Sequence, residues 1–224
     1  MAKNDFTGES AENYEQKCLC VLVLDVSGSM RGNPIAELNQ GLKDFYQEIS
    51  NDETTKQRLE IALIEFNSAV KNTLSPALVD NFTMPELEAN GSTAMVDAVN
   101  AAIDLVADRK AWYKETNQNY YRPWIILMTD GEPDSDQDIN ALAQRIQNDT
   151  AQKRYAFMPI GVEGANMKIL DQIKGNFPPM KLQGTKFCAF FKWLSTSMGT
   201  VVTAEEGQKV DLTEGMDIWG VFEI

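Results

Sequence analysis

Histidine is absent from this chain of 224 residues. Histidine is the side chain most often used as a general base, and it activates the nucleophile in serine and cysteine hydrolases. Its absence excludes Ser-His and Cys-His nucleophile pairs. Conventional hydrolase chemistry is therefore disfavoured.

Positive charge is also scarce. The chain has 20 Lys and Arg against 33 Asp and Glu, which gives a formal net charge of −13. A strongly acidic surface repels the phosphates of nucleic acids and anionic lipid headgroups. We therefore expect neither nucleic acid nor a membrane surface as a partner.

Cysteines and long apolar segments are few. Cys18 and Cys20 alternate along one predicted strand, where a disulfide is sterically disfavoured, and Cys188 lies in a predicted aromatic helix. All three are best explained as buried small apolar residues. The polar residues 1–16 contain no apolar core, so they predict neither a signal peptide nor a membrane span, and we expect a cytoplasmic protein.

Oxygen-bearing side chains follow the first strongly apolar run. Residues 21–24 predict a buried strand, and Asp25, Ser27 and Ser29 come at alternate positions where it ends. Gly28 lets the loop turn, and Asn33 is the predicted N-cap of the helix that follows. A carboxylate and two hydroxyls are part of the oxygen shell that a hard cation such as Mg2+ prefers.

Two later loops supply matching oxygens. A second apolar run, residues 124–128, leads to Asp130 and Gly131, and Thr93 opens a helix rich in small residues. Each residue has an ordinary alternative: Asp25 as a loop cap, the serines as turn formers, Thr93 as an N-cap, and Asp130 as a turn residue. Taken together, the three loops favour one shared metal ion.

These residues resemble a known family. Asp25, Ser27, Ser29, Thr93 and Asp130 match all five positions of the metal-ion-dependent adhesion site (MIDAS) of von Willebrand factor A (VWA) domains. The resemblance covers roughly residues 17–200. It implies that the hydroxyls ligate directly in the ligand-bound state, while the two acids act partly through coordinated water.

The resemblance also implies the fold: a doubly wound, Rossmann-like α/β domain with a mostly parallel sheet in the order 3-2-1-4-5-6, one antiparallel edge strand, and helices on both faces. The alternation of apolar patterns agrees with it. We divide the chain into a polar tail (1–16), the VWA-like domain (17–200) and an acidic and apolar extension (201–224). Predicted strands cover about 17–25, 59–66, 69–74, 124–130, 155–162 and 180–182, and predicted helices about 35–49, 94–107, 138–150, 167–173 and from 186 onward.

The last predicted helix, 187–195, resembles bacterial VWA proteins of the tellurium-resistance, TerY-like type. That resemblance implies a stress-response system with kinase-like and phosphatase-like proteins as partners. Longer members carry a zinc ribbon, and this chain has no second cysteine cluster for one.

The predicted function is metal-dependent protein binding, in which Mg2+, with Mn2+ or Ca2+ as alternatives, receives a carboxylate from a partner. A phosphoryl-transfer enzyme with Asp25 as nucleophile is a second hypothesis. It is weakened by Ser27, which stands where such sites need a second Asp, and by the lack of a phosphate-binding Gly-Lys-Ser/Thr loop.

A metal-independent scaffold is the third hypothesis. The apolar residues 216–224 support it either as a partner-binding peptide or, as we favour, as an extra strand on the same domain. Asp134, Asp136 and Asp138 resemble the start of an EF-hand loop. Ile139 and Arg145 break that pattern, so a charged helix N-terminus is the better interpretation.

Overall fold

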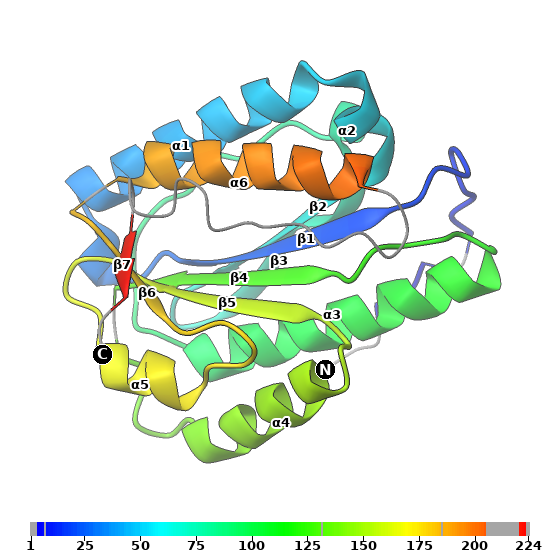
Figure 1. Ribbon diagram of the computed structural model, residues 1–224. Helices are drawn as coiled ribbons and strands as arrows, with labels where there is room; N and C mark the ends of the chain where they lie inside the picture. Colours follow the sequence, from blue (N-terminus) through cyan, green and yellow to red (C-terminus); the bar gives the residue numbers. More distant parts are fainter. Residues whose placement is uncertain (1–3, 7, 131, 185, 205–219, 223–224) are drawn as a thin grey trace.

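A central β-sheet lies between two layers of helices in the computed structural model (Figure 1). The structure describes residues 4–6, 8–130, 132–184, 186–204 and 220–222. Helices α1, α2 and α6 cover one face of the sheet, and α3, α4 and α5 cover the other (Figure 1). This is the predicted α/β architecture with helices on both faces.

The strand order is β3-β2-β1-β4-β5-β6-β7. Strands β1, β2, β4, β5 and β6 run parallel, whereas β3 pairs antiparallel with β2 at one edge. The order of the first six strands and the antiparallel edge strand β3 were both predicted, whereas β7 adds a second antiparallel edge strand next to β6. The strands are β1 (Cys18–Asp25), β2 (Leu59–Phe66), β3 (Val70–Leu78), β4 (Trp124–Thr129), β5 (Ala156–Gly161), β6 (Met180–Leu182) and β7 (Gly220–Phe222).

The predicted helices are present with two differences, and the structure adds a short helix, α2, that was not predicted. Helix α3 runs eight residues beyond the predicted end at 107, because Trp112 and Tyr113 continue its buried face. The predicted N-cap of α1 is wrong: Gly32, at φ 84°, takes that position, and the Asn33 side chain bonds Glu37 instead. The helices are α1 (Asn33–Ser50), α2 (Glu53–Arg58), α3 (Met95–Glu115), α4 (Ile139–Ala151), α5 (Met167–Gln172) and α6 (Phe187–Thr203), with short 3-10 turns at Gly28–Met30 and Val79–Asn81.

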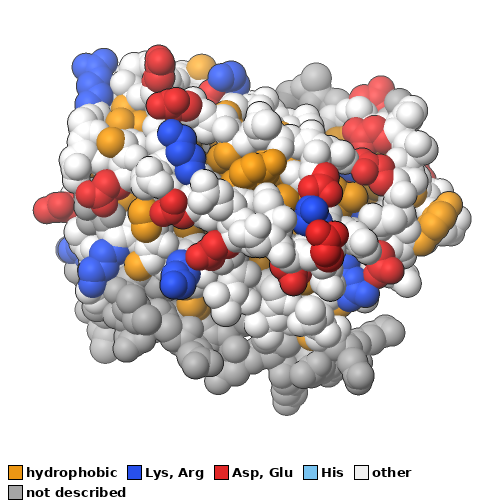
Figure 2. All heavy atoms as spheres, turned by 90° about the horizontal axis from the view of Figure 1, so that it is seen from above, with side chains coloured by type: hydrophobic (Ala, Val, Ile, Leu, Met, Phe, Trp, Pro, Cys, Tyr) orange, Lys and Arg blue, Asp and Glu red, His pale blue; other side chains and the backbone are white. Residues whose placement is uncertain are grey.

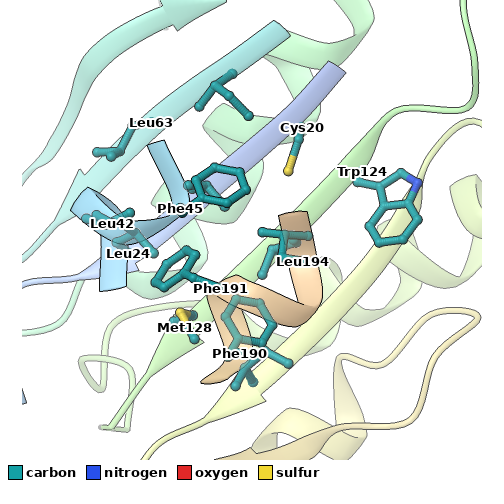
Figure 3. Close-up of a cluster of buried hydrophobic side chains, with 14 of the residues drawn as sticks. Cys20, Leu24, Leu42, Phe45, Leu63, Trp124, Met128, Phe190, Phe191 and Leu194 are labelled. Atoms are coloured by element: carbon teal, nitrogen blue, oxygen red, sulfur yellow. The ribbon is translucent and has the colours of Figure 1, made fainter. Parts of the chain in front are cut away.

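Helices α1 and α6 pack closely over one face of the sheet. The rings of Phe45 and Phe191 lie 5.6 Å apart between centroids and point toward each other in the core (Figure 3). Gly41 makes this approach possible, since a Cβ there would stand 2.7 Å from Phe191 Cδ2.

The outer face of this helical layer carries charges of both signs. Seen from above, acidic and basic side chains are interspersed, with apolar side chains between them (Figure 2). The net negative charge of the chain therefore does not make this face uniformly acidic.

A buried ion pair lies on the opposite side of the sheet. Arg109 donates from Nε to Glu60 Oε2 at 2.9 Å and from Nη2 to Glu60 Oε1 at 2.8 Å. Tyr113 Oη donates to the same carboxylate at 2.5 Å. All three side chains are buried. A charge removed from water is stable only when it is paired in this way, so the network ties α3 to β2.

The first and the last described segments contact the domain. In the N-terminal segment Phe6 is buried among the apolar residues between the sheet and α3, and Glu9 accepts a hydrogen bond from Arg109 Nη1 at 2.6 Å. At the other end β7 pairs antiparallel with β6. Among the described residues, no helix is long and apolar enough to cross a membrane.

Candidate metal site

The first loop of the site begins where β1 ends at Asp25. The Ser27 backbone N–H donates to Asp25 Oδ1 at 2.8 Å, and Thr129 Oγ1, at the end of β4, donates to Asp25 Oδ2 at 2.5 Å. Both carboxylate oxygens of Asp25 are therefore oriented by neighbouring strand ends. Thr129 was not identified from the sequence. Its position directly before Asp130, at the end of the same strand, could have indicated a role in the site.

The second acid joins the same cluster. Ser29 Oγ donates to Asp130 Oδ1 at 2.8 Å, and the hydroxyls of Ser27 and Ser29 lie 3.0 Å apart. Strands β1 and β4 are hydrogen-bonded neighbours, so their carboxyl ends emerge side by side. The structure thus brings four of the five predicted residues together, while Gly131 lies outside the described residues.

The loop that carries Thr93 is joined to the first loop by a backbone hydrogen bond. The Gly28 N–H donates to the Gly91 carbonyl at 3.0 Å, which fixes the loop before α3 against the first loop. A Cβ on Gly28 would stand only 3.3 Å from that oxygen, so glycine suits the close approach. Thr93 is buried, and no hydrogen bond joins its side chain to the other four predicted ligands in the described structure.

The alternative role of Thr93 as a helix cap is not observed. The N-cap of α3 is Ala94, which has no capping side chain. The Thr93 hydroxyl is therefore not used to satisfy the first turn of α3, and it remains available as a ligand.

The acids after Asp130 have separate roles. Asp138 caps α4, because its carboxylate accepts the Ala141 N–H at 2.9 Å, which confirms the helix N-terminus interpretation for this residue. Asp136 is exposed. Asp134 instead holds the Thr93 loop, and sequence reasoning missed this because the contact crosses 41 residues.

The two acids of the cluster are buried without a counter-charge. Asp25 is 1% exposed and Asp130 is 9% exposed, and neither has a Lys or Arg partner among the described residues. Burial raises the pKa of both carboxyls, although hydrogen bonds from Ser27 and Thr129 to Asp25 and from Ser29 to Asp130 act in the opposite direction. A nearby cation would reverse the effect of burial.

The chemistry of this donor set fits a hard divalent cation. All five predicted side chains offer oxygen, and only two of them are carboxylates. No cluster of three or more Cys, Asp or Glu of the kind that holds a metal occurs in the described part of the chain. The hydroxyls of Ser27, Ser29 and Thr93 would therefore have to supply much of the protein's share of the shell, and exposed Ser29 leaves one side open to solvent.

The fold and the cluster define a class: a doubly wound α/β domain with an oxygen-rich site beyond the carboxyl ends of two adjacent parallel strands, where such folds bind ligands. Residues 20–183 match the von Willebrand factor type A domain family. The chain belongs to that family. Its domains typically bind other proteins, often through a metal held at the MIDAS. A search of curated protein sequences gives no significant match.

Solved structures share the fold at low sequence identity. The pilus adhesin SpaC from Lactobacillus rhamnosus GG superimposes with a TM-score of 0.63 and 14% identity over 84% of this chain and 31% of its own. The ArnB paralog VWA2 from Sulfolobus acidocaldarius gives 0.53 and 14%, over 83% and 45% of the two chains.

A third structure, proximal thread matrix protein 1 from the mussel byssus with a zinc-occupied MIDAS motif, gives a TM-score of 0.53 and 18% identity, over 85% of this chain and 46% of its own. The present chain thus spans less than half the length of each of these three proteins. Their likeness establishes the fold.

Proposed function

We propose that this chain is a metal-dependent protein-binding module in which Asp25, Ser27, Ser29, Thr93 and Asp130 hold a divalent cation. One observation carries the proposal: two buried carboxylates meet without a basic partner and are surrounded by hydroxyls. Buried charges in proteins are paired or coordinate metals. A cation is the counter-charge that this cluster lacks.

The ion we propose is Mg2+, with Mn2+ or Ca2+ able to replace it. Mg2+ accepts few carboxylates and keeps several waters, which suits a site of two acids and three hydroxyls. An ion held partly by neutral hydroxyls keeps net positive charge and can accept a carboxylate from another molecule. The partner group would therefore be an Asp or Glu, presented on a surface that is otherwise neutral or basic, because this chain is acidic.

The phosphoryl-transfer hypothesis finds less support. Both oxygens of Asp25 accept hydrogen bonds, from the Ser27 N–H and the Thr129 hydroxyl, and the side chain is almost wholly buried. An attacking carboxylate needs an oxygen exposed to its substrate. The arrangement suits a residue that orients water or neighbouring ligands.

The cellular setting is a further part of the proposal. The likeness of 187–195 to TerY-like proteins favours a bacterial stress-response role in the cytoplasm, within tellurium resistance, with kinase-like or phosphatase-like proteins as carriers of the carboxylate. Capture of such a protein that persists in a chelator would contradict this role for the metal.

A magnesium titration tests the site. Calorimetry on the wild type, Thr93→Ala and Asp130→Ala should give binding to the wild type and a loss of about tenfold or more in each variant. Asp136→Ala is the matched control, since it removes an exposed acid from the same loop. If all four proteins bind Mg2+ alike, the assigned ligands are wrong.

A peptide selection tests the carboxylate. Random peptides captured by the immobilised wild type in Mg2+ and released by a chelator should be enriched in Asp and Glu relative to peptides captured by Asp130→Ala. Equal enrichment on both proteins would contradict the proposed binding mode.

A further inference from the structure

Asp134 fastens the loop that carries Thr93. Its Oδ1 and Oδ2 each lie 3.2 Å from the Thr93 backbone nitrogen, and Ser92 Oγ donates to Oδ2 at 2.8 Å. In return, the Asp134 N–H donates to the Thr93 carbonyl at 3.0 Å. Both peptide groups of Thr93 and both oxygens of Asp134 are engaged in this contact.

The contact closes a ring of three loops. The first loop bonds the second through Gly28 and Gly91, the first bonds the third through Ser29 and Asp130, and Asp134 joins the third to the second. Each loop carries at least one proposed ligand. The ring therefore fixes the relative positions of all five ligands before a metal arrives.

Thr93 depends on this ring more than the other ligands do. Asp25, Ser27, Ser29 and Asp130 are held by hydrogen bonds of their own side chains, whereas the described structure gives no such bond to the Thr93 side chain. Its hydroxyl is placed by its backbone alone. Asp134 holds the backbone on both sides of the Thr93 α-carbon, while the neighbouring N–H groups of Ala94 and Ser92 bond the Asn67 carbonyl at 2.7 Å and the Ser68 hydroxyl at 2.9 Å.

We propose that Asp134 is a positioning residue that sets the place of the Thr93 hydroxyl in the metal site. The inference rests on the proposed function, since it concerns the same ion. Because its oxygens face Thr93 and Ser92, Asp134 acts through the Thr93 loop and not as a ligand. Residues that orient metal ligands in this way typically change metal affinity by about 10- to 100-fold when mutated.

Four single variants and one double variant test the inference. Mg2+ affinity is measured by calorimetry for Asp134→Ala, Asp134→Asn, Asp136→Ala and Thr93→Ala, and for Asp134→Ala combined with Thr93→Ala. Asp134→Ala should lose about tenfold or more in affinity. Asp134→Asn, which keeps an oxygen for the Thr93 N–H, should lose less. Asp136→Ala has the same charge change and should stay within about twofold of the wild type.

The double variant separates positioning from simple attraction between charges. If Asp134 acts through Thr93, its removal should change affinity little once the Thr93 hydroxyl is gone, so the two losses are not additive. Additive losses, or equal losses in Asp134→Ala and Asp136→Ala, would overturn the inference.

The remaining outcomes are also decisive. Gln137 Oε1 accepts the Val96 N–H at 2.7 Å and holds the start of α3 independently, so Asp134→Ala should fold. If Asp134→Ala does not fold, the Mg2+ affinities of Asp134→Asn and Ser92→Ala take its place. Wild-type affinity in both variants overturns the inference, and a weakened affinity in either supports it. A wild type that binds no Mg2+ rejects the proposed function together with the inference, whereas normal binding by both the wild type and Asp134→Ala rejects the inference alone.

Discussion

Replacing Gly41 by alanine tests how closely α1 and α6 approach. A Cβ at this position would lie 2.7 Å from Phe191 Cδ2 and 3.2 Å from the Phe187 carbonyl carbon, both shorter than van der Waals contact. Phe191 is fully buried against Phe45 and Phe190, so its ring cannot move away without disturbing the core. Overpacking of this kind typically costs about 1–3 kcal/mol.

Alanine also stabilises a helix relative to glycine by about 1 kcal/mol, which partly offsets the clash. The matched control is Gly199→Ala in α6, where a Cβ would meet nothing within 4 Å. We expect this control to raise the free energy of unfolding by about 0.5–1 kcal/mol. The difference between the two variants isolates the steric cost, which should be about 1–3 kcal/mol.

Urea denaturation followed by circular dichroism measures both variants, provided that the m-values agree with that of the wild type. Gly41→Ala should unfold at a lower urea concentration than the wild type, and Gly199→Ala at a higher one. Equal stabilisation by both substitutions would refute the inferred packing of the two helices.

The buried ion pair gives a second prediction. Arg109→Met leaves the Glu60 carboxylate without its cation and should lower the free energy of unfolding, measured by urea denaturation, by about 3–5 kcal/mol. Arg145→Met removes one partner of a partly exposed pair and should lower it by less than about 1 kcal/mol. Similar costs would contradict the role of burial. The third prediction concerns the thiols. Burial raises the pKa of Cys18 to about 12, so its contribution to stability is complete below pH about 9 and is lost as the pH rises toward 12. Unfolding curves from pH 8 to 11 should show a decline that Cys18→Ala reduces. A thiol reagent at pH 8 should modify the partly exposed Cys188 before Cys18.

The strands and the first ligand loop could be predicted because their signals are local. Buried parallel strands require nearly continuous apolar runs, and residues 21–24 and 124–128 are such runs, each followed within two residues by an acid. The strand order came from the family resemblance, and the hydrogen-bonded pairing of β1 with β4 agrees with it.

The parts that were missed depend on contacts distant in sequence. The bond from Thr129 to Asp25 spans 104 residues, and the contact of Asp134 with Thr93 spans 41. The pattern of acids at 134, 136 and 138 predicts only a negatively charged helix start, which holds for Asp138. Nothing local distinguishes Asp134, because its role arises from the way two loops meet.

The last strand, β7, also changes what the domain presents to other molecules. An unpaired edge offers a row of backbone donors and acceptors to which a strand from another chain can add. With β7 paired to β6, that edge becomes a three-residue antiparallel strand, too short to template much further pairing. Strand β7 thus covers the edge at β6, while the nine-residue β3 forms the opposite edge of the sheet and carries Lys71 and Pro76, which disfavour the addition of a further strand there.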